Sequence, residues 1–177
     1  YGPELIANGG FGADLSDWST TGTVTYSAGQ ARFGESNLVG PHTLSQTLTT
    51  TNGAYYRLEF DYRDDGIWNQ QLQVAVDGSS NRLSTEKILT DTDGTTFVRY
   101  QYSFVADAES TTVTFTDTSD NAGSLSANSN SIDGYLDNIS VRQSFGDLNS
   151  VAYNEGGSPV VLNSNLEIFD SELTAAD

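Results

Sequence analysis

Apolar and polar residues alternate along several short segments of this chain, and this pattern restricts the fold more than any other feature. Residues 55–63 read YYRLEFDYR, in which apolar side chains occupy every second position. The segments 72–76, 98–104 and 113–115 show the same pattern. Such alternation is typical of half-buried strands, whereas an amphipathic helix repeats about every 3.6 residues. Many short strands between polar turns predict an all-β fold, a jelly-roll β-sandwich.

The charge balance excludes several classes of partner. The 177 residues include seven basic and 24 acidic side chains, for a net charge of -17, and no cysteine. Disulfides and thiolate metal sites are therefore excluded. Nucleic acids and anionic membranes need clusters of Lys and Arg, so we expect neither as a partner, and no apolar segment is long enough for membrane insertion. The composition is rich in Thr, Ser, Asn, Asp and Gly, which is typical of secreted bacterial β-proteins, so we expect a protein that is secreted or on a bacterial cell surface. No signal peptide is recognised, and we expect the sequence to be a piece of a larger protein.

Two segments at opposite ends of the β-rich region form a pair: ELIANGGF (residues 4–11) and YLDNISV (residues 135–141). Trp18 follows the first after a polar loop, and residues 44–48 read L-x-Q-x-L. With these features, residues 3–142 resemble the galactose-binding-like jelly rolls of the carbohydrate-binding-module type. The resemblance implies that the first and last strands run side by side, with a structural calcium ion where they meet. It also implies a buried tryptophan at Trp18.

In that family the aspartate of the L-D-N motif, here Asp137, is a usual calcium ligand. Simple alternation also places Asp137 on the same inward face as Ile139 and Val141. An inward carboxylate is costly unless a cation or hydrogen-bond donors meet it. The chain departs from the family at Gly12, where an acidic residue is usual. This departure weakens the expected contribution of the first strand to the calcium site.

Acidic loops supply further candidate calcium ligands, because Ca²⁺ takes roughly six to eight oxygen ligands from carboxylates, carbonyls and water. The candidates besides Asp137 are Asp64, Asp65, Asp117, Asp120 and Asp133. None has EF-hand spacing, and the alternative for each is a solvated turn residue. We expect at least one bound Ca²⁺ as the only cofactor.

The same loops suggest where a ligand binds. Trp68 lies at a loop end after Asp64 and Asp65, and it could stack on a sugar ring or plug the end of the sandwich. Gln71 and Gln73 lie on the strand that follows, where they could offer amides to a polar ligand or be plain surface residues.

The composition changes after Gln143. Residues 144–150 read as a linker. The segment that follows, residues 151–177, contains the run N-E-G-G-S-P-V-V-L and the isolated Asp170. With these features it resembles the start of the cadherin-like and immunoglobulin-like repeats of giant bacterial RTX adhesins. A full repeat needs roughly 100 residues. We therefore predict a ligand-binding domain at residues 1–143, followed by a linker and a truncated repeat next to further adhesin domains.

Catalysis is not expected. The single histidine, His42, lies in a loop and reads as a surface residue, and no nucleophile–base pair or H-E-x-x-H motif occurs.

The favoured interpretation is a calcium-dependent, peptide-binding module of an adhesin that captures peptide C-termini during cell attachment and biofilm formation. A first alternative is a glycan-binding module of an adhesin or of a polysaccharide-degrading enzyme. A second is a structural spacer stiffened by calcium. The partner is accordingly a peptide C-terminus or a glycan on a host or neighbouring cell surface.

Overall fold

A computed structural model describes residues 1–34, 42–63, 71–79, 82–83, 87–89, 96–118 and 134–144. The chain divides into two compact units, Tyr1–Ser144 and Phe145–Asp177. All described residues belong to the first unit. The expected linker and adhesin-like repeat lie outside the described residues and stay predictions.

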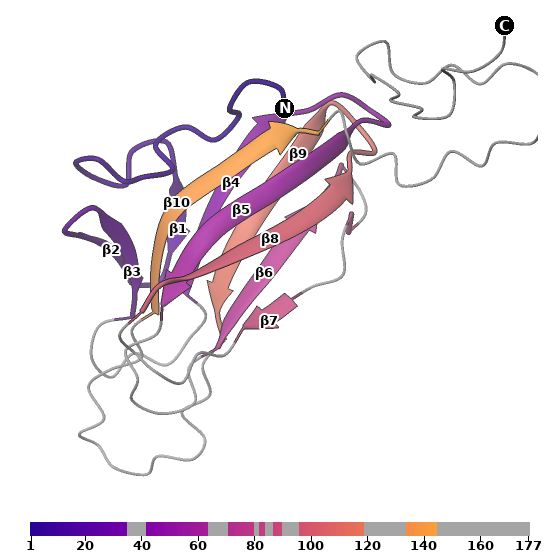
Figure 1. Cartoon of the computed structure of the whole chain (residues 1–177). Coiled ribbons are helices and arrows are strands. Elements are labelled where there is room, and N and C mark those ends of the chain that lie inside the picture. The colour runs from indigo at the N-terminus through magenta and orange to yellow at the C-terminus, as the bar shows by residue number, and fades with distance from the viewer. Residues whose placement is uncertain are drawn as a thin grey trace, which may run out of the picture. The chain divides into compact units, whose positions relative to one another are not determined.

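The first unit consists of two five-stranded antiparallel sheets (Figure 1). One sheet has the order β1-β4-β9-β6-β7, formed by Ser19–Thr21, His42–Thr49, Ser110–Asp117, Leu72–Asp77 and Lys87–Leu89. The other has the order β2-β3-β10-β5-β8, formed by Val24–Ser27, Gln30–Phe33, Gly134–Gln143, Tyr55–Arg63 and Val98–Val105. No helix occurs among the described residues. The all-β jelly-roll β-sandwich predicted from the alternation is confirmed.

The core lies between the two sheets, where alternate residues of each strand meet. In β5 every second residue from Tyr56 to Tyr62 is buried, and β4 and β9 alternate in the same way. Phe60 of β5 meets Phe115 of β9 edge-to-face across the sandwich, with ring centroids 5.0 Å apart. Trp18 packs against Phe115 and is buried, as predicted. Burying a large apolar side chain contributes about 1.5–3 kcal/mol, so these rings hold the sheets together.

The first ten residues, the N-terminal strap, run alongside β10. The amide of Gly2 donates to the carbonyl of Gln143 (2.8 Å), that of Leu5 to Val141 (3.0 Å), and that of Ile139 to Gly9 (2.9 Å). The predicted adjacency of the first and last segments is therefore confirmed. The strap is not a regular strand, however, since its only ladder pairing is a single bridge between Glu4 and Arg142.

A buried glutamine attaches the strap to the opposite sheet. Gln46 of β4 is only 9% exposed, and its side-chain amide donates to the carbonyls of Ala7 (3.0 Å) and Asp17 (3.1 Å). Its Oε1 accepts a hydrogen bond from the amide of Ala7 at 2.8 Å. The central residue of the L-x-Q-x-L segment thus holds a chain segment that has no ladder partner in that sheet.

A β-bulge in β10 corrects the expected orientation of Asp137. Asp137 pairs with Asp61 and Ser140 pairs with Glu59, so two residues of β10 lie opposite one residue of β5. Asn138, at φ 50°, is the extra residue. One inserted residue reverses the alternation, and Leu136 and Ile139 are therefore both buried while Asp137 lies on the outer face. The prediction that Asp137 shares the inward face of Ile139 and Val141 was wrong.

Candidate functional site

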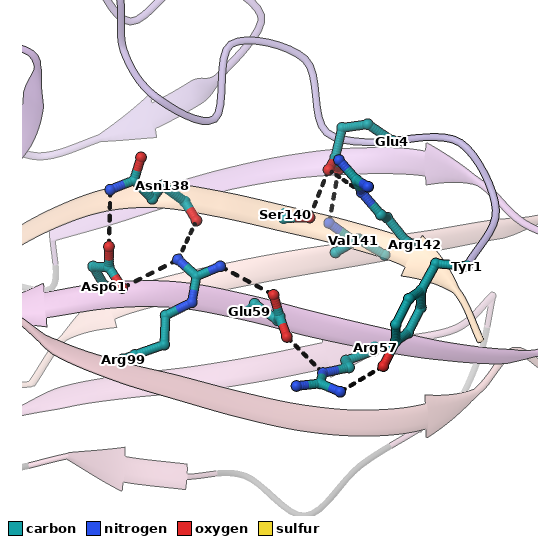
Figure 2. Close-up of polar contacts among 10 residues, drawn as sticks. All are labelled: Tyr1, Glu4, Arg57, Glu59, Asp61, Arg99, Asn138, Ser140, Val141 and Arg142. Atoms are coloured by element: carbon teal, nitrogen blue, oxygen red, sulfur yellow. Dashed lines mark hydrogen bonds and ion pairs between the residues drawn. The ribbon is translucent and has the colours of Figure 1, made fainter. Parts of the chain in front are cut away.

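A groove of about 510 Å³ lies on the outer face of the β2-β3-β10-β5-β8 sheet. The N-terminal strap forms one side, β8 contributes the other, and β10 and β5 form the floor. The side chains that line it include Tyr1, Glu4, Arg57, Glu59, Arg99 and Arg142 (Figure 2). Arg57 and Glu59 lie on this face because they occupy outward positions of β5, on either side of the buried Leu58.

Glu59 lies at the centre of a fixed arrangement of charges (Figure 2). Its Oε2 accepts a hydrogen bond from Nη2 of Arg99 at 3.0 Å, and its Oε1 lies 2.6 Å from Nε of Arg57. The second contact is an ion pair whose N–H is not aligned for a hydrogen bond. One carboxylate therefore holds two guanidinium groups in place.

Arg99 also connects the groove to the β-bulge. Its Nη1 donates to Oδ1 of Asp61 (3.1 Å) and to the carbonyl of Asn138 (3.2 Å), and Asn138 Nδ2 donates to Oδ2 of Asp61 (2.8 Å). Burial lowers the pKa of Arg99, but the hydrogen bonds and charges of Asp61 and Glu59 outweigh it and raise that pKa overall. The guanidinium is thus a permanent cation in a fixed position.

Glu4 fixes the strap to β10. Its Oε2 accepts hydrogen bonds from Oγ of Ser140 (2.5 Å) and Nε of Arg142 (3.0 Å), and its Oε1 accepts from the amide of Val141 (2.8 Å). Burial raises the pKa of Glu4, yet the hydrogen bonds, led by that from Ser140, lower it overall. The carboxylate is therefore held in its ionised form, in which it accepts all of these bonds.

Tyr1 supplies an aromatic ring at one end of the groove. Its hydroxyl accepts a hydrogen bond from Nη1 of Arg57 at 2.5 Å, and the guanidinium carbon lies 5.6 Å from the ring centroid. The side chain is 65% exposed. A large part of the ring is therefore open to a ligand.

The outer faces of the two sheets differ in chemistry. The groove face carries Arg32, Arg57, Arg63, Arg99 and Arg142, five of the seven basic residues in the sequence. Arg63 lies over the ring of Tyr135, 4.1 Å from its centroid. The outer face of the other sheet carries hydroxyl groups on the neighbouring strands β4 and β9: Thr43, Ser45, Thr47, Thr112, Thr114 and Thr116. Guanidinium groups are thus concentrated on one side of the sandwich.

Two carboxylates face each other on the groove face, beyond the residues that line the groove. Asp137 and Asp61 are direct partners across β10 and β5. The pKa of Asp137 is raised, mainly by burial and further by the charge of Asp61, while the hydrogen bond from the amide of Asn138 opposes the rise. Like charges directly opposite each other destabilise a sheet.

We expect Asp137→Asn to raise the stability at pH 7 in the absence of calcium. Because the folded-state pKa is raised, the stability that Asp137 contributes is complete below its unfolded pKa of about 3.9. This contribution is lost as the pH rises through the folded-state pKa. The gain should be about 0.5 kcal/mol, because solvent screens this partly exposed pair. Denaturant unfolding at pH 7 and at pH 3 measures it, and the gain should vanish at pH 3.

Asp14→Asn is the matched control, since it removes the same charge from a fully exposed position whose pKa is lowered. Added calcium separates the roles of Asp137. If the ion binds Asp137, the wild-type melting temperature rises with calcium and that of Asp137→Asn does not. A loss of stability in calcium-free Asp137→Asn would contradict the repulsion between the two carboxylates.

Three other sequence-predicted site residues belong to the part of the chain that the structure describes, and they lie away from the groove. Asp117, at the end of β9, is 8% exposed and lies directly opposite His42 of β4. Both residues belong to the sheet that does not carry the groove. Gln73 is at an outward position of β6 in that sheet, and Gln71 precedes the same strand. The remaining predicted residues, Asp64, Asp65, Trp68, Asp120 and Asp133, lie outside the described residues. Their roles stay predictions.

His42 differs from the expected surface residue. It is 5% exposed, and its Nδ1 accepts a hydrogen bond from the amide of Thr23 at 2.8 Å. The residue begins β4, and strand alternation turns it inward. Within the described ranges, no group of three or more His, Asp or Glu side chains is arranged to hold a metal ion.

The groove residues were missed from the sequence, although one signal was available. The outward positions of β5 hold Arg57, Glu59, Asp61 and Arg63, a run of alternating charges on one strand face. Five of the seven basic residues then meet on adjacent strands. Only the strand order reveals that Arg99 and Arg142 join this run.

Comparison with solved structures shows the same fold in carbohydrate-binding modules. TmCBM61 in complex with β-1,4-galactotriose has a TM-score of 0.59 at 14% identity, covering 80% of this chain and 99% of that chain. A family 4 module, CBM4, has a TM-score of 0.55 at 11% identity, covering 78% and 99%. The CBM22-1 xylan-binding domain of Xyn10C from Paenibacillus barcinonensis has a TM-score of 0.52 at 13% identity, covering 80% and 95%. At these identities the likeness shows the fold.

Comparison at the level of sequence identifies a family. No curated protein matches the chain. One family matches residues 10–142, which include all the strands of the sandwich from β1 to β9 and nearly all of β10. The chain therefore belongs to the family described as "Protein of unknown function (DUF642)".

Proposed function

We propose that Tyr1–Ser144 is a non-catalytic glycan-binding module and that its ligand binds in the groove on the outer face of β10, β5 and β8. The observation that carries the proposal is the groove itself. Its volume of about 510 Å³ lies within the range of roughly 300–1,000 Å³ that is usual for small-molecule sites. The groove combines fixed polar side chains with one exposed ring.

The polar groups suit a ligand with many hydroxyl groups. A guanidinium offers several N–H donors in a planar fork, and a carboxylate accepts from hydroxyl groups. Glu59 holds both Arg57 and Arg99, and Arg99 has further partners at Asp61 and Asn138. Side chains that are already fixed lose little conformational entropy when a ligand binds, which favours affinity. The exposed ring of Tyr1 can pack against the apolar face of a sugar.

The ionisation of the groove supports binding without catalysis. Glycoside hydrolysis usually needs one carboxylic acid with a raised pKa that protonates the leaving oxygen. In the groove, Glu4 has a lowered pKa, and Glu59 contacts two arginines. With its lowered pKa, Glu4 is not suited to act as the proton donor at neutral pH. The raised pKa of Asp137 belongs to a residue that does not line the groove.

Likeness of fold supports the same proposal, since modules that share this sandwich include CBM4 and a xylan-binding domain. A role outside the cell, in an adhesin or beside a polysaccharide-degrading enzyme, follows as part of the proposal. Within the described part of the chain, no helix is long and apolar enough to cross a membrane. Calcium-dependent capture of peptide C-termini stays a prediction, because most residues on which it depends lie outside the described residues.

Calorimetric titration with β-1,4-galacto-oligosaccharides and xylo-oligosaccharides, after a glycan array, tests the proposal. Glu59→Gln keeps the shape of the side chain but removes the charge that holds Arg57 and Arg99. We expect it to weaken glycan binding at least tenfold, equivalent to about 1.4 kcal/mol. Gln73→Ala, on the outer face of the opposite sheet, is the matched control and should bind like the wild type.

Each titration is repeated with calcium and with chelator. A peptide with a free C-terminal carboxylate and the same peptide amidated provide the competing ligand class. Loss of glycan binding in Gln73→Ala but not in Glu59→Gln would move the site to the other sheet. Binding of the free-acid peptide alone, and only with calcium, would replace the glycan proposal by peptide capture.

A further inference from the structure

Two arginines on the floor of the groove lie directly opposite each other. Arg142 of β10 and Arg57 of β5 are partners in the antiparallel pairing of these strands, and both side chains are on the outer face. Side chains at such positions start from β-carbons that are only about 5 Å apart. Like charges directly opposite each other destabilise a sheet. This arginine pair therefore costs stability unless enough negative charge lies close to it.

The carboxylates of the groove compensate the arginine pair only in part. Among the described residues, Glu4 accepts hydrogen bonds from five donors, of which one is Nε of Arg142. Glu59 divides its charge between Arg99 and the other arginine of the pair. The described lining thus has three arginines and two glutamates, an excess of one positive charge. Asp61, outside the lining, adds its charge beside Arg99, so the excess lies at the arginine pair.

The arginine pair also has N–H donors to spare. None of the described residues accepts a hydrogen bond from Nη1 or Nη2 of Arg142, and none accepts one from Nη2 of Arg57. The terminal nitrogens of a guanidinium form a planar fork that matches two oxygens of one carboxylate or sulfate. The side chain of Arg142 is 51% exposed, so its unused fork is open to a ligand.

We propose that the glycan bound in the groove is acidic and that its carboxylate or sulfate group binds to Arg57 and Arg142. This inference rests on the proposed function, to which it adds the chemical class of the ligand. An anion at this place offsets the repulsion within the arginine pair and accepts hydrogen bonds from its spare N–H groups. A neutral sugar can accept the hydrogen bonds, but it leaves the repulsion in place.

The acidic character of the rest of the chain does not oppose this binding. Although the net charge is -17, salt screens exposed charges that are more than about 8 Å apart at physiological ionic strength. The charges that decide the affinity are therefore those in the groove. Tyr1, whose hydroxyl accepts a hydrogen bond from Arg57, offers its exposed ring to the sugar that carries the acidic group (Figure 2).

Pairs of glycans that differ only in charge test the inference. A glycan array compares oligosaccharides that contain uronic acids with their methyl esters, and sulfated galactans with the same galactans after desulfation. The acidic probe that binds best and its neutral counterpart are then titrated by calorimetry with chelator present, which excludes a metal ion as the partner of the acid. We expect the acidic probe to bind at least tenfold more tightly. Raising the salt from about 0.1 M to about 0.5 M should weaken the binding of the acidic probe only. A preference for uronic acids identifies the group as a carboxylate, and a preference for sulfated galactans identifies it as a sulfate.

Three variants locate the acidic group. Arg142→Gln removes one charge of the pair and its fork, and we expect at least tenfold weaker binding of the acidic probe with little change for the neutral one. Arg142→Lys keeps the charge without the fork and should give an intermediate affinity. Arg63→Gln removes the same charge from an outward position of β5 that does not line the groove, and it should bind like the wild type.

The outcomes separate this inference from the proposed function. Equal binding of the acidic and neutral probes by the wild type, or equal losses for both probes in Arg142→Gln, would overturn the acidic ligand and leave a glycan-binding groove in place. Binding of no glycan, acidic or neutral, would overturn both. Binding of the acidic probe that is lost in Arg63→Gln but kept in Arg142→Gln would also contradict the arginine pair as its site.

Discussion

Gly9→Ala should lower the free energy of unfolding by roughly 3 kcal/mol, as expected for a side chain forced into a filled space. A β-carbon at Gly9 would lie 1.9 Å from the carbonyl oxygen of Ile139 and 3.0 Å from Cγ2 of Ile6. The strap cannot simply move away, because the Gly9 carbonyl accepts the hydrogen bond from the Ile139 amide. Urea unfolding measures the loss. Because the strap forms one side of the groove, glycan affinity should fall as well.

Gly10→Ala is the matched control, since a β-carbon at Gly10 would have no atom within 4 Å. Gly10 also lines the groove, so this variant tests whether any added methyl group at the strap disturbs it. We expect Gly10→Ala to unfold within about 0.5 kcal/mol of the wild type, as surface substitutions usually do. Equal losses in the two variants would mean that the strap does not pass so close to β10.

Gln46→Ala should also be strongly destabilising, by about 2–4 kcal/mol, because the loss of a buried partner leaves backbone groups without hydrogen bonds. The side chain bonds to both the amide and the carbonyl of Ala7 and to the carbonyl of Asp17. Truncation would thus release the strap from β4, while Glu4 would still hold the strap to β10. Denaturant unfolding and the exchange rate of the Ala7 amide provide two measurements.

Thr47→Ala is the control on the neighbouring residue of β4, whose side chain is exposed and bonds to Oγ1 of Thr112. It should cost less than about 1 kcal/mol, since exposed hydroxyl pairs contribute little. Gln46→Glu adds a second test, because a carboxylate can accept from Ala7 but cannot donate to the two carbonyls. Wild-type stability in Gln46→Glu would contradict the proposed role of the amide.

The strands were predictable because their signal is local. The alternation in residues 55–63 is set by which face meets the core, and it appears unchanged in β5. The orientation of Asp137 was not predictable in the same way. A single inserted residue, Asn138, leaves no mark in the period of the pattern, although asparagine tolerates the left-handed conformation that it adopts. On each side of the bulge, buried and outward residues of β10 still alternate.

The groove was less predictable than the fold because it is assembled from distant residues. Glu4 meets Ser140 across 136 positions of sequence, and Arg99 meets Glu59 across 40. The sequence pattern showed that Glu59 points outward, but not that β8 and β10 flank β5. The pairing of the strap with β10, in contrast, was implied by the family resemblance that the two motifs carry.

The concentration of arginines on one sheet has a consequence for how the module meets a surface. Five of seven basic residues share that face with Glu59, Asp61 and Asp137, in a chain whose net charge is -17. Glu4 borders the same face, so the charges described there nearly cancel, with five arginines against four carboxylates. The groove face is therefore close to neutral, whereas the chain as a whole is strongly acidic. An acidic surface would repel this face less than it repels the rest of the chain, so the groove side is the side that can approach such a surface.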